Sequence, residues 1–108
     1  IDTILQHHRL DQHFHDIFTN PAFFDSETGC LNIQPYGQQT CSTCPSNMCK
    51  REILQRYVQS EPWKIIFIGD GHNDVCAAKD LKEGDLVCAR RGYRMAKELK
   101  ELPPLKAK

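Results

Sequence analysis

An acidic loop with two glycines follows the most apolar run of the chain. The run Lys64–Ile68 leads into GDGHND, which contains two carboxylates and an amide at Asp70, Asn73 and Asp74. In an open α/β sheet, ligands bind beyond the carboxyl ends of the strands, and hard oxygen ligands are those that Mg²⁺ prefers. We therefore expect a magnesium site at Asp70, Asn73 and Asp74. The alternative is an ordinary acidic turn in which Asn73 or Asp74 favours the dipole of the following helix.

An upstream lysine is placed to reach the same edge of the sheet. Lys50 is expected at the start of the helix that precedes the apolar strand. A helix of about ten residues rises roughly 15 Å and a strand of five residues returns about 17 Å, so Lys50 and Asp70 should meet. There the ammonium can neutralise a bound phosphate as a point charge. The alternative is a solvated helix lysine.

Four further residues lie where a substrate would bind. Gly71 allows the backbone to approach a ligand closely, and His72 lies inside the same loop, where a side chain can set specificity. Arg90 and Arg91 follow the last expected strand at the same edge of the sheet. They either meet a substrate phosphate or solvate the start of a helix, and the sequence leaves both open. We take Gly71, His72 and Arg91 as the candidate substrate contacts.

Three of the six cysteines form a CxxCxxxxC pattern at Cys41, Cys44 and Cys49. With a nearby histidine they could bind zinc, because thiolates are preferred zinc ligands. Without a second CxxC or a spaced histidine pair the pattern is weak, and small buried or loop cysteines are the favoured interpretation. We expect reduced thiols, because no secretory signal precedes them. The sequence leaves metal binding by these cysteines open.

The elements that must position these residues alternate between strand and helix, which predicts an α/β fold with a parallel sheet and flanking helices. The strand at 64–68 reads as covered on both faces, because it is a continuous apolar run. We expect one domain over 1–102 and a frayed tail over 103–108. The expected elements are a helix at 2–11, a strand at 15–20, a small β-hairpin at 23–33, a helix from an N-cap at Ser46 to Ser60, strands at 64–68 and 86–89, and helices at 73–81 and 93–102.

Charge and hydropathy exclude several partners. Lys and Arg together number 14, as do Asp and Glu, so no net field favours nucleic acid or an anionic membrane surface. No apolar stretch approaches the roughly 18 residues of a membrane span, and a cytoplasmic location is expected. The chain opens on Ile1 and not on methionine, from which we expect a truncated sequence or fragment.

These motifs carry a resemblance to a known family. GDGHND with an upstream lysine resembles motifs three and four of the haloacid dehalogenase phosphatases. The segments IFTNP, CSTCPSNMCK, GDGHNDVC and RRGY resemble the branch of phosphoethanolamine/phosphocholine phosphatase and pyridoxal-phosphate phosphatase. The resemblance implies a Rossmann-like fold, a Mg²⁺ cofactor at Asp70 supported by Asn73 and Asp74, and a catalytic Lys50 that holds the transferring phosphoryl group.

Parts of the family pattern are missing. Such phosphatases attack phosphorus with an aspartate in a DxDxT-like motif, and no such motif occurs here. The family sheet has the order 3-2-1-4-5, and the resemblance assigns strands 3, 4 and 5 to 15–20, 64–68 and 86–89, without the two central strands. A partial fold with unpaired edges is expected to self-associate. The nucleophile should therefore lie in an N-terminal segment outside this sequence.

Two hypotheses follow. In the first, a full-length protein hydrolyses a small phosphomonoester of the phosphoethanolamine, phosphocholine or pyridoxal phosphate class through an aspartyl-phosphate, and this chain alone is inactive. In the second, the chain is a catalytically inactive fragment or a zinc-stabilised binding module. The sequence does not distinguish between the phosphomonoesters, because specificity would depend on residues outside it.

Overall fold

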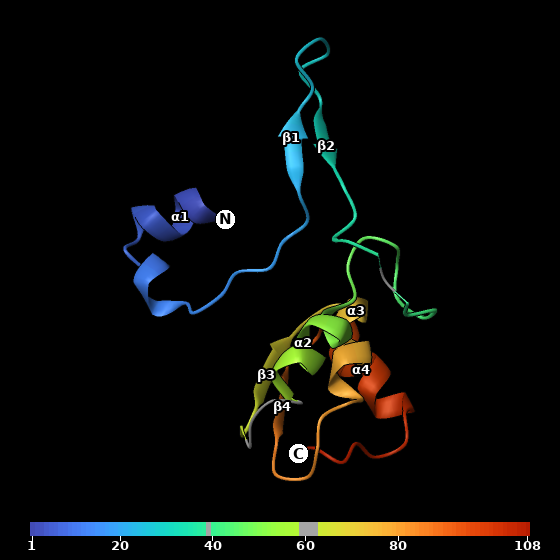
Figure 1. Cartoon of the computed structure of the whole chain (residues 1–108). Coiled ribbons are helices and arrows are strands. Elements are labelled where there is room, and N and C mark those ends of the chain that lie inside the picture. Colours follow the sequence, from blue (N-terminus) through green and yellow to red (C-terminus); the bar gives the residue numbers. More distant parts are fainter. Residues whose placement is uncertain (39, 59–62) are drawn as a thin grey trace. The chain divides into compact units, whose positions relative to one another are not determined.

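A computed structural model describes residues 1–38, 40–58 and 63–108 (Figure 1). The chain has a mixed α/β structure and divides into two compact units, Ile1–Gln34 and Pro35–Lys108, where the sequence predicts one domain over 1–102. No helix among the described residues is long and apolar enough to cross a membrane.

The first unit contains two short helical segments and a hairpin. Helix α1 covers Asp2–His7, and the 3₁₀ segment η1 covers Asp11–His13. The predicted helix at 2–11 is therefore interrupted, because Arg9 adopts a left-handed conformation with φ 54°. The residue run 15–20, predicted as a strand, forms no strand. Its β-branched and aromatic residues favour extended structure only where a neighbouring strand pairs with them, and no described residue does so.

The predicted hairpin is confirmed. Strands β1 (Ala22–Phe24) and β2 (Leu31–Ile33) pair antiparallel. Asp25 Oδ1 accepts hydrogen bonds from the backbone N–H of Thr28 at 2.7 Å and from its hydroxyl at 2.8 Å. Gly29 has φ 68°, the positive value that glycine adopts without strain. The polar turn therefore sets the register of the two strands.

The second unit alternates helix and strand. Its elements are α2 (Lys50–Val58), β3 (Ile66–Gly69), α3 (His72–Ala78), β4 (Leu86–Ala89) and α4 (Arg94–Glu101). Helix α2 begins at Lys50, where the start of the helix is expected, and not directly after the N-cap predicted at Ser46. The Asn47 carbonyl accepts the Tyr36 N–H at 2.7 Å. In a helix that started after Ser46, this carbonyl would instead point along the helix axis. The predicted end of this helix at Ser60 lies outside the described residues.

Strands β3 and β4 form a parallel pair, as predicted, with Ile66 opposite Leu86. Helix α3 packs against both α2 and α4. The apolar core is built on three buried side chains, Val75, Ala78 and Met95. Partly buried residues of the strands, of α4 and of the segment after it pack against this core: Phe67, Val87, Ala89, Leu99, Leu102 and Leu105.

Only one face of this strand pair is covered by the described residues. Phe67 packs on the core, whereas its neighbours Ile66 and Ile68 are 61% and 75% exposed. The prediction that the strand is covered on both faces is therefore wrong for this chain. Successive side chains of a strand point to opposite faces, and the core helices cover one of them.

The segment after α4 is held in place, although the sequence predicts a frayed tail over 103–108. Lys108 donates its N–H to the Asp85 carbonyl at 3.0 Å, and its own carbonyl accepts the Val87 N–H at 2.6 Å. Ala107 is buried. The last residues therefore extend the hydrogen bonding along β4.

A buried carboxylate joins the starts of the two strands. Asp85, which is 5% exposed, accepts the Ile65 N–H at 3.0 Å through Oδ1 and the Lys82 N–H at 2.8 Å through Oδ2. These two hydrogen bonds hold the pKa of Asp85 below its usual value. The stabilisation is therefore present above the unfolded-state pKa of about 3.9 and is lost as the pH falls through the lower, folded-state pKa.

We predict that Asp85→Asn lowers the free energy of unfolding at neutral pH by about 1 to 2 kcal/mol, because the amide retains only one of the two acceptors. The loss should shrink as the pH falls from the unfolded-state pKa of about 3.9 through the lower folded-state pKa, at which the carboxylate of the unmodified chain becomes protonated. Urea unfolding at neutral and acidic pH measures both effects. Glu83→Gln, an exposed change in the same turn, is the matched control and should change little. Equal losses in the two variants would contradict the assignment.

Candidate active site

The carboxylate of Asp74 lies at the centre of the candidate site. Asp74 is in the first turn of α3 and is 2% exposed. Its Oδ2 accepts the backbone N–H groups of Asp70 and Gly71, each at 2.9 Å. Its Oδ1 accepts a hydrogen bond from Lys50 Nζ at 2.6 Å. One side chain therefore fixes both the loop after β3 and the first residue of α2.

The Asp74 carboxylate remains ionised despite its burial. Burial is the largest single influence and acts to raise the pKa of Asp74. The hydrogen bonds from Lys50 and from the N–H groups of Gly71 and Asp70, with the charge of Lys50, outweigh it and hold this pKa below its usual value. Both oxygens of Asp74 are thus occupied by donors of the protein.

The two glycines of the loop lie close to the side chains of Asp74 and of its neighbour Asn73. A Cβ at Gly69 would lie 2.7 Å from both Cβ and Cγ of Asp74. A Cβ at Gly71 would lie 2.8 Å from Oδ1 of Asn73. The contact at Gly69 is with the Asp74 side chain itself, so glycine at this position allows the buried carboxylate to lie beneath the loop, whereas the contact at Gly71 is with the end of the Asn73 side chain.

The carboxylate of Asp70 is open to solvent, with 51% of its side chain exposed. Its Oδ2 lies 3.9 Å from Nη1 of Arg90, whose guanidinium is 4.0 Å from the centre of the Tyr93 ring. Backbone hydrogen bonds hold the same region, because Arg90 of the loop after β4 donates its N–H to the Gly69 carbonyl and Met95 of α4 donates to the Asp70 carbonyl, each at 2.9 Å. The loop after β4 therefore positions Asp70.

The remaining predicted substrate contacts lie around this loop. His72 Nδ1 is 2.7 Å from Oε2 of Glu98 on α4. His72 and Glu98 line a cavity of about 450 Å³ whose lining includes neither Lys50 nor Asp70. Arg91 is exposed. The structure thus brings Lys50, Asp70, Gly71 and Asp74 into one set of contacts, and it directs the His72 side chain toward α4.

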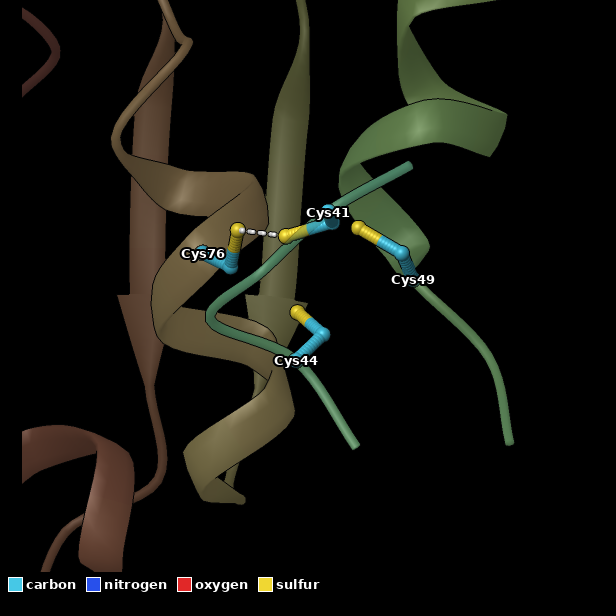
Figure 2. A group of neighbouring side chains, drawn as sticks. All are labelled: Cys41, Cys44, Cys49 and Cys76. Carbon is cyan, nitrogen blue, oxygen red and sulfur yellow. Dashed lines mark hydrogen bonds between the residues drawn. The ribbon is translucent and has the colours of Figure 1, made fainter. Parts of the chain in front are cut away.

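The three patterned cysteines are joined by a fourth, Cys76 of α3 (Figure 2). The four sulfur atoms all lie within 4.8 Å of one another. A hydrogen bond from the Thr43 hydroxyl is the largest influence on Cys41 and lowers its pKa to about 6. Burial raises the pKa of Cys44 and of Cys49. These four cysteines offer a group of soft sulfur ligands, whereas Asp70 offers a hard oxygen ligand.

Some of these contacts could not be read from the sequence. The sequence placed Lys50 beside Asp70, whereas its ammonium contacts Asp74, and the two predicted partners meet through that carboxylate. Cys76 was missed as a partner of the CxxC segment. No local signal in the sequence pairs Cys76 with the CxxC segment, because their contact depends on how the elements pack.

The whole chain, residues 1–108, matches the family described as Putative Phosphatase, and the chain belongs to this family. Among curated proteins it is 40% identical over 105 residues to a probable phosphatase phospho2 of Xenopus tropicalis, covering 92% of this chain and 44% of that protein. It is 36% identical over 108 residues to the mouse pyridoxal phosphate phosphatase PHOSPHO2, covering 94% of this chain and 44% of that protein. No solved structure matches.

A third relative is the phosphoethanolamine/phosphocholine phosphatase of Gallus gallus, which is 36% identical over 95 residues, with 82% of this chain and 35% of that protein covered. The resemblance to this phosphatase branch is therefore confirmed. The chain spans less than half of the length of each of these three relatives.

We predict that Asp74→Asn destabilises the protein by on the order of 2 kcal/mol, because a buried carboxylate with three donors is lost. In a double-mutant cycle with Lys50→Met, the coupling free energy should be smaller, about 1 kcal/mol, since the Lys50 side chain is 41% exposed and solvent screens the pair.

The matched control is Asp80→Asn. Asp80 follows the end of α3, pairs with Arg51 of α2 at 2.6 Å and is 27% exposed, so it is a comparable but more solvated ion pair. In denaturant unfolding, Asp80→Asn should lower the free energy of unfolding by less than Asp74→Asn does. A larger loss at Asp80, or zero coupling between positions 50 and 74, would contradict the central role of Asp74.

Proposed function

We propose that the protein that contains this chain is a Mg²⁺-dependent phosphatase that hydrolyses a small phosphomonoester. The observation that supports this best is the arrangement around Asp74, which holds a lysine and an exposed aspartate at the carboxyl end of a parallel strand. The substrate class proposed is that named for the relatives: pyridoxal phosphate, or phosphoethanolamine and phosphocholine. We propose a cytoplasmic location, which the six free thiols support.

The residues present suit one part of a magnesium site. Asp70 has an exposed carboxylate whose nearest cation, Arg90, is 3.9 Å away, so its oxygens remain accessible to a hard cation. Asp74 is unsuited to direct ligation, because its two oxygens already accept three hydrogen bonds. We therefore propose Asp70 as the ligand, with Asp74 orienting the loop and Asn73 beside it. When bound, Mg²⁺ would supply positive charge next to the phosphoryl oxygens.

Lys50 is proposed to hold the transferring phosphoryl group. An ammonium has three N–H donors, and Asp74 Oδ1 accepts one of them. The side chain is 41% exposed, which leaves donors directed toward solvent and available to phosphate oxygens. The contact with Asp74 fixes the position of the ammonium in advance, and such preorganisation favours the transition state over a mobile lysine.

The nucleophile in this proposal is an aspartate from a segment outside this sequence. The chain contains no DxDxT-like motif. Covalent catalysis of the proposed kind requires a carboxylate that attacks phosphorus as the alcohol leaves, and water then hydrolyses the aspartyl-phosphate. Gly71 and Arg91 remain proposed substrate contacts, whereas the pairing of His72 with Glu98 directs that side chain toward α4, beside a cavity whose lining does not include Lys50. The chain alone should therefore be inactive.

The first test is Asp70→Asn in the protein with its nucleophile segment. Turnover of an aryl phosphate should fall by on the order of 100-fold or more, and the Mg²⁺ concentration for half-maximal rate should rise, because a charged ligand becomes neutral. The chain alone is the negative control. Glu83→Gln, a distant exposed change, should leave the rate unaltered. Unchanged turnover of Asp70→Asn at limiting Mg²⁺ would remove the metal assignment.

The second test separates the charge of Lys50 from its shape. Lys50→Ala should lower turnover roughly 100-fold, which corresponds to a few kcal/mol of lost transition-state stabilisation. Lys50→Arg should not restore turnover, because a planar guanidinium does not replace a compact ammonium. Thermal melting of the same variants shows whether the fold survives. Normal turnover in both variants would leave Lys50 as a structural residue only.

A further inference from the structure

Four sulfur atoms from three separate segments converge on one point of the second unit. Cys41 and Cys44 come from the loop before α2, Cys49 directly precedes α2, and Cys76 lies in α3 (Figure 2). All pairs of Sγ atoms lie within 4.8 Å, and those of Cys41 and Cys76 are 3.6 Å apart. The remaining cysteines, Cys30 and Cys88, are exposed and do not belong to the group.

These separations suit a shared metal ion better than a covalent bond. With zinc–sulfur bonds of about 2.3 Å, the sulfur atoms of a tetrahedral site lie about 3.8 Å apart. The 3.6 Å between Cys41 and Cys76 is close to that value. A disulfide requires about 2.05 Å, and all six cysteines are free thiols.

We propose that Cys41, Cys44, Cys49 and Cys76 bind one zinc ion as a closed structural site. Four thiolates fill a tetrahedral coordination shell and leave no open position for a substrate, so the role is structural and not catalytic. The pair Cys41 and Cys44 has the CxxC spacing typical of such sites. This proposal stands independently of the phosphatase function.

The loop that carries two of the ligands is already held in position. Oε1 of Glu52 on α2 accepts the N–H of Thr40 at 2.8 Å and the N–H of Cys41 at 3.0 Å. The Thr43 hydroxyl lies 3.2 Å from the sulfur of Cys41 and 3.6 Å from that of Cys76. Hydrogen bonds of this kind orient metal ligands and stabilise their negative charge.

Positive charge is also present beside the group. The pKa of the Arg51 guanidinium is raised, chiefly by Asp80 and in smaller part by the nearby Cys76 sulfur. A zinc ion bound by four thiolates retains a net negative charge, and a neighbouring cation offsets part of it. The alternative is that Cys49 and Cys76, both buried, are small apolar residues of the interior. That alternative does not account for the convergence of the half-buried Cys41 and Cys44 on them.

The zinc ion would connect the two elements of the candidate active site. Cys49 directly precedes Lys50, and Cys76 lies two residues after Asp74. A metal bound by both cysteines would therefore hold the start of α2 against α3 next to the contact between Lys50 and Asp74. Its removal should loosen α2 without removing any ligand of the proposed magnesium site.

The experiment is metal analysis of the purified protein that contains this chain together with its nucleophile segment, kept reduced and supplied with Zn²⁺. We expect one zinc per chain and a melting temperature that falls when a strong chelator removes it. Replacement by Co²⁺ should give the intense visible bands of tetrahedral cobalt with a sulfur-to-cobalt charge-transfer band. That spectrum reports four sulfur ligands without any substitution, so the test does not depend on how well a variant folds.

Single substitutions then assign the ligands. Cys76→Ser and Cys44→Ser should each abolish stoichiometric zinc and the tetrahedral cobalt spectrum, whereas the matched controls Cys30→Ser and Cys88→Ser should retain both. The proposal is overturned if the reduced protein binds no zinc, if Cys76→Ser keeps it, or if Co²⁺ shows the weak bands of octahedral oxygen ligation. A mononuclear iron spectrum, or a disulfide within the group under reducing conditions, would also overturn it.

Discussion

The second unit depends on one buried charge. The Asp74 carboxylate is almost fully removed from water, and an isolated charge in such a place would be strongly destabilising. Two backbone N–H groups and the Lys50 ammonium compensate it, so each of these donors is constrained to a fixed position. The burial of one carboxylate therefore determines the conformation of the glycine loop and the place where α2 begins.

Gly69 and the loop after β4 follow from the same constraint. No side chain fits at Gly69 while Asp74 occupies its position, so this position needs glycine on steric grounds and not for a positive φ. Because Asp74 fixes the backbone of Asp70 from one side and Arg90 and Met95 contact that residue from the other, the Asp70 carboxylate projects outward. A polar interaction in the interior thus produces an accessible carboxylate at the surface.

The sequence predicted most of this unit, because its evidence there is local. The apolar run before GDGHND, the strand at 86–89 and the helix ended by Pro103 each depend on residues within the element, and the structure has all three. The strand expected at 15–20 was wrong, since a strand needs a partner that local composition does not reveal. Cys76 could not be predicted as a neighbour of Cys41 because their contact depends on how α2 packs on α3.

The attachment of α2 differs in kind from that of the other elements. None of its described side chains belongs to the apolar core, which is formed by the strands, α3, α4 and the segment after α4. Side-chain hydrogen bonds of α2 to this region run from Lys50 to Asp74 of α3 and from Arg51 and Gln55 to Asp80, which follows the end of α3. Partly solvated polar contacts are weak individually, so a helix attached in this way gains more from a metal crosslink than one attached by apolar packing. The cysteine group lies at the N-terminal end of α2, which begins at Lys50, so such a crosslink would also fix the position of Lys50.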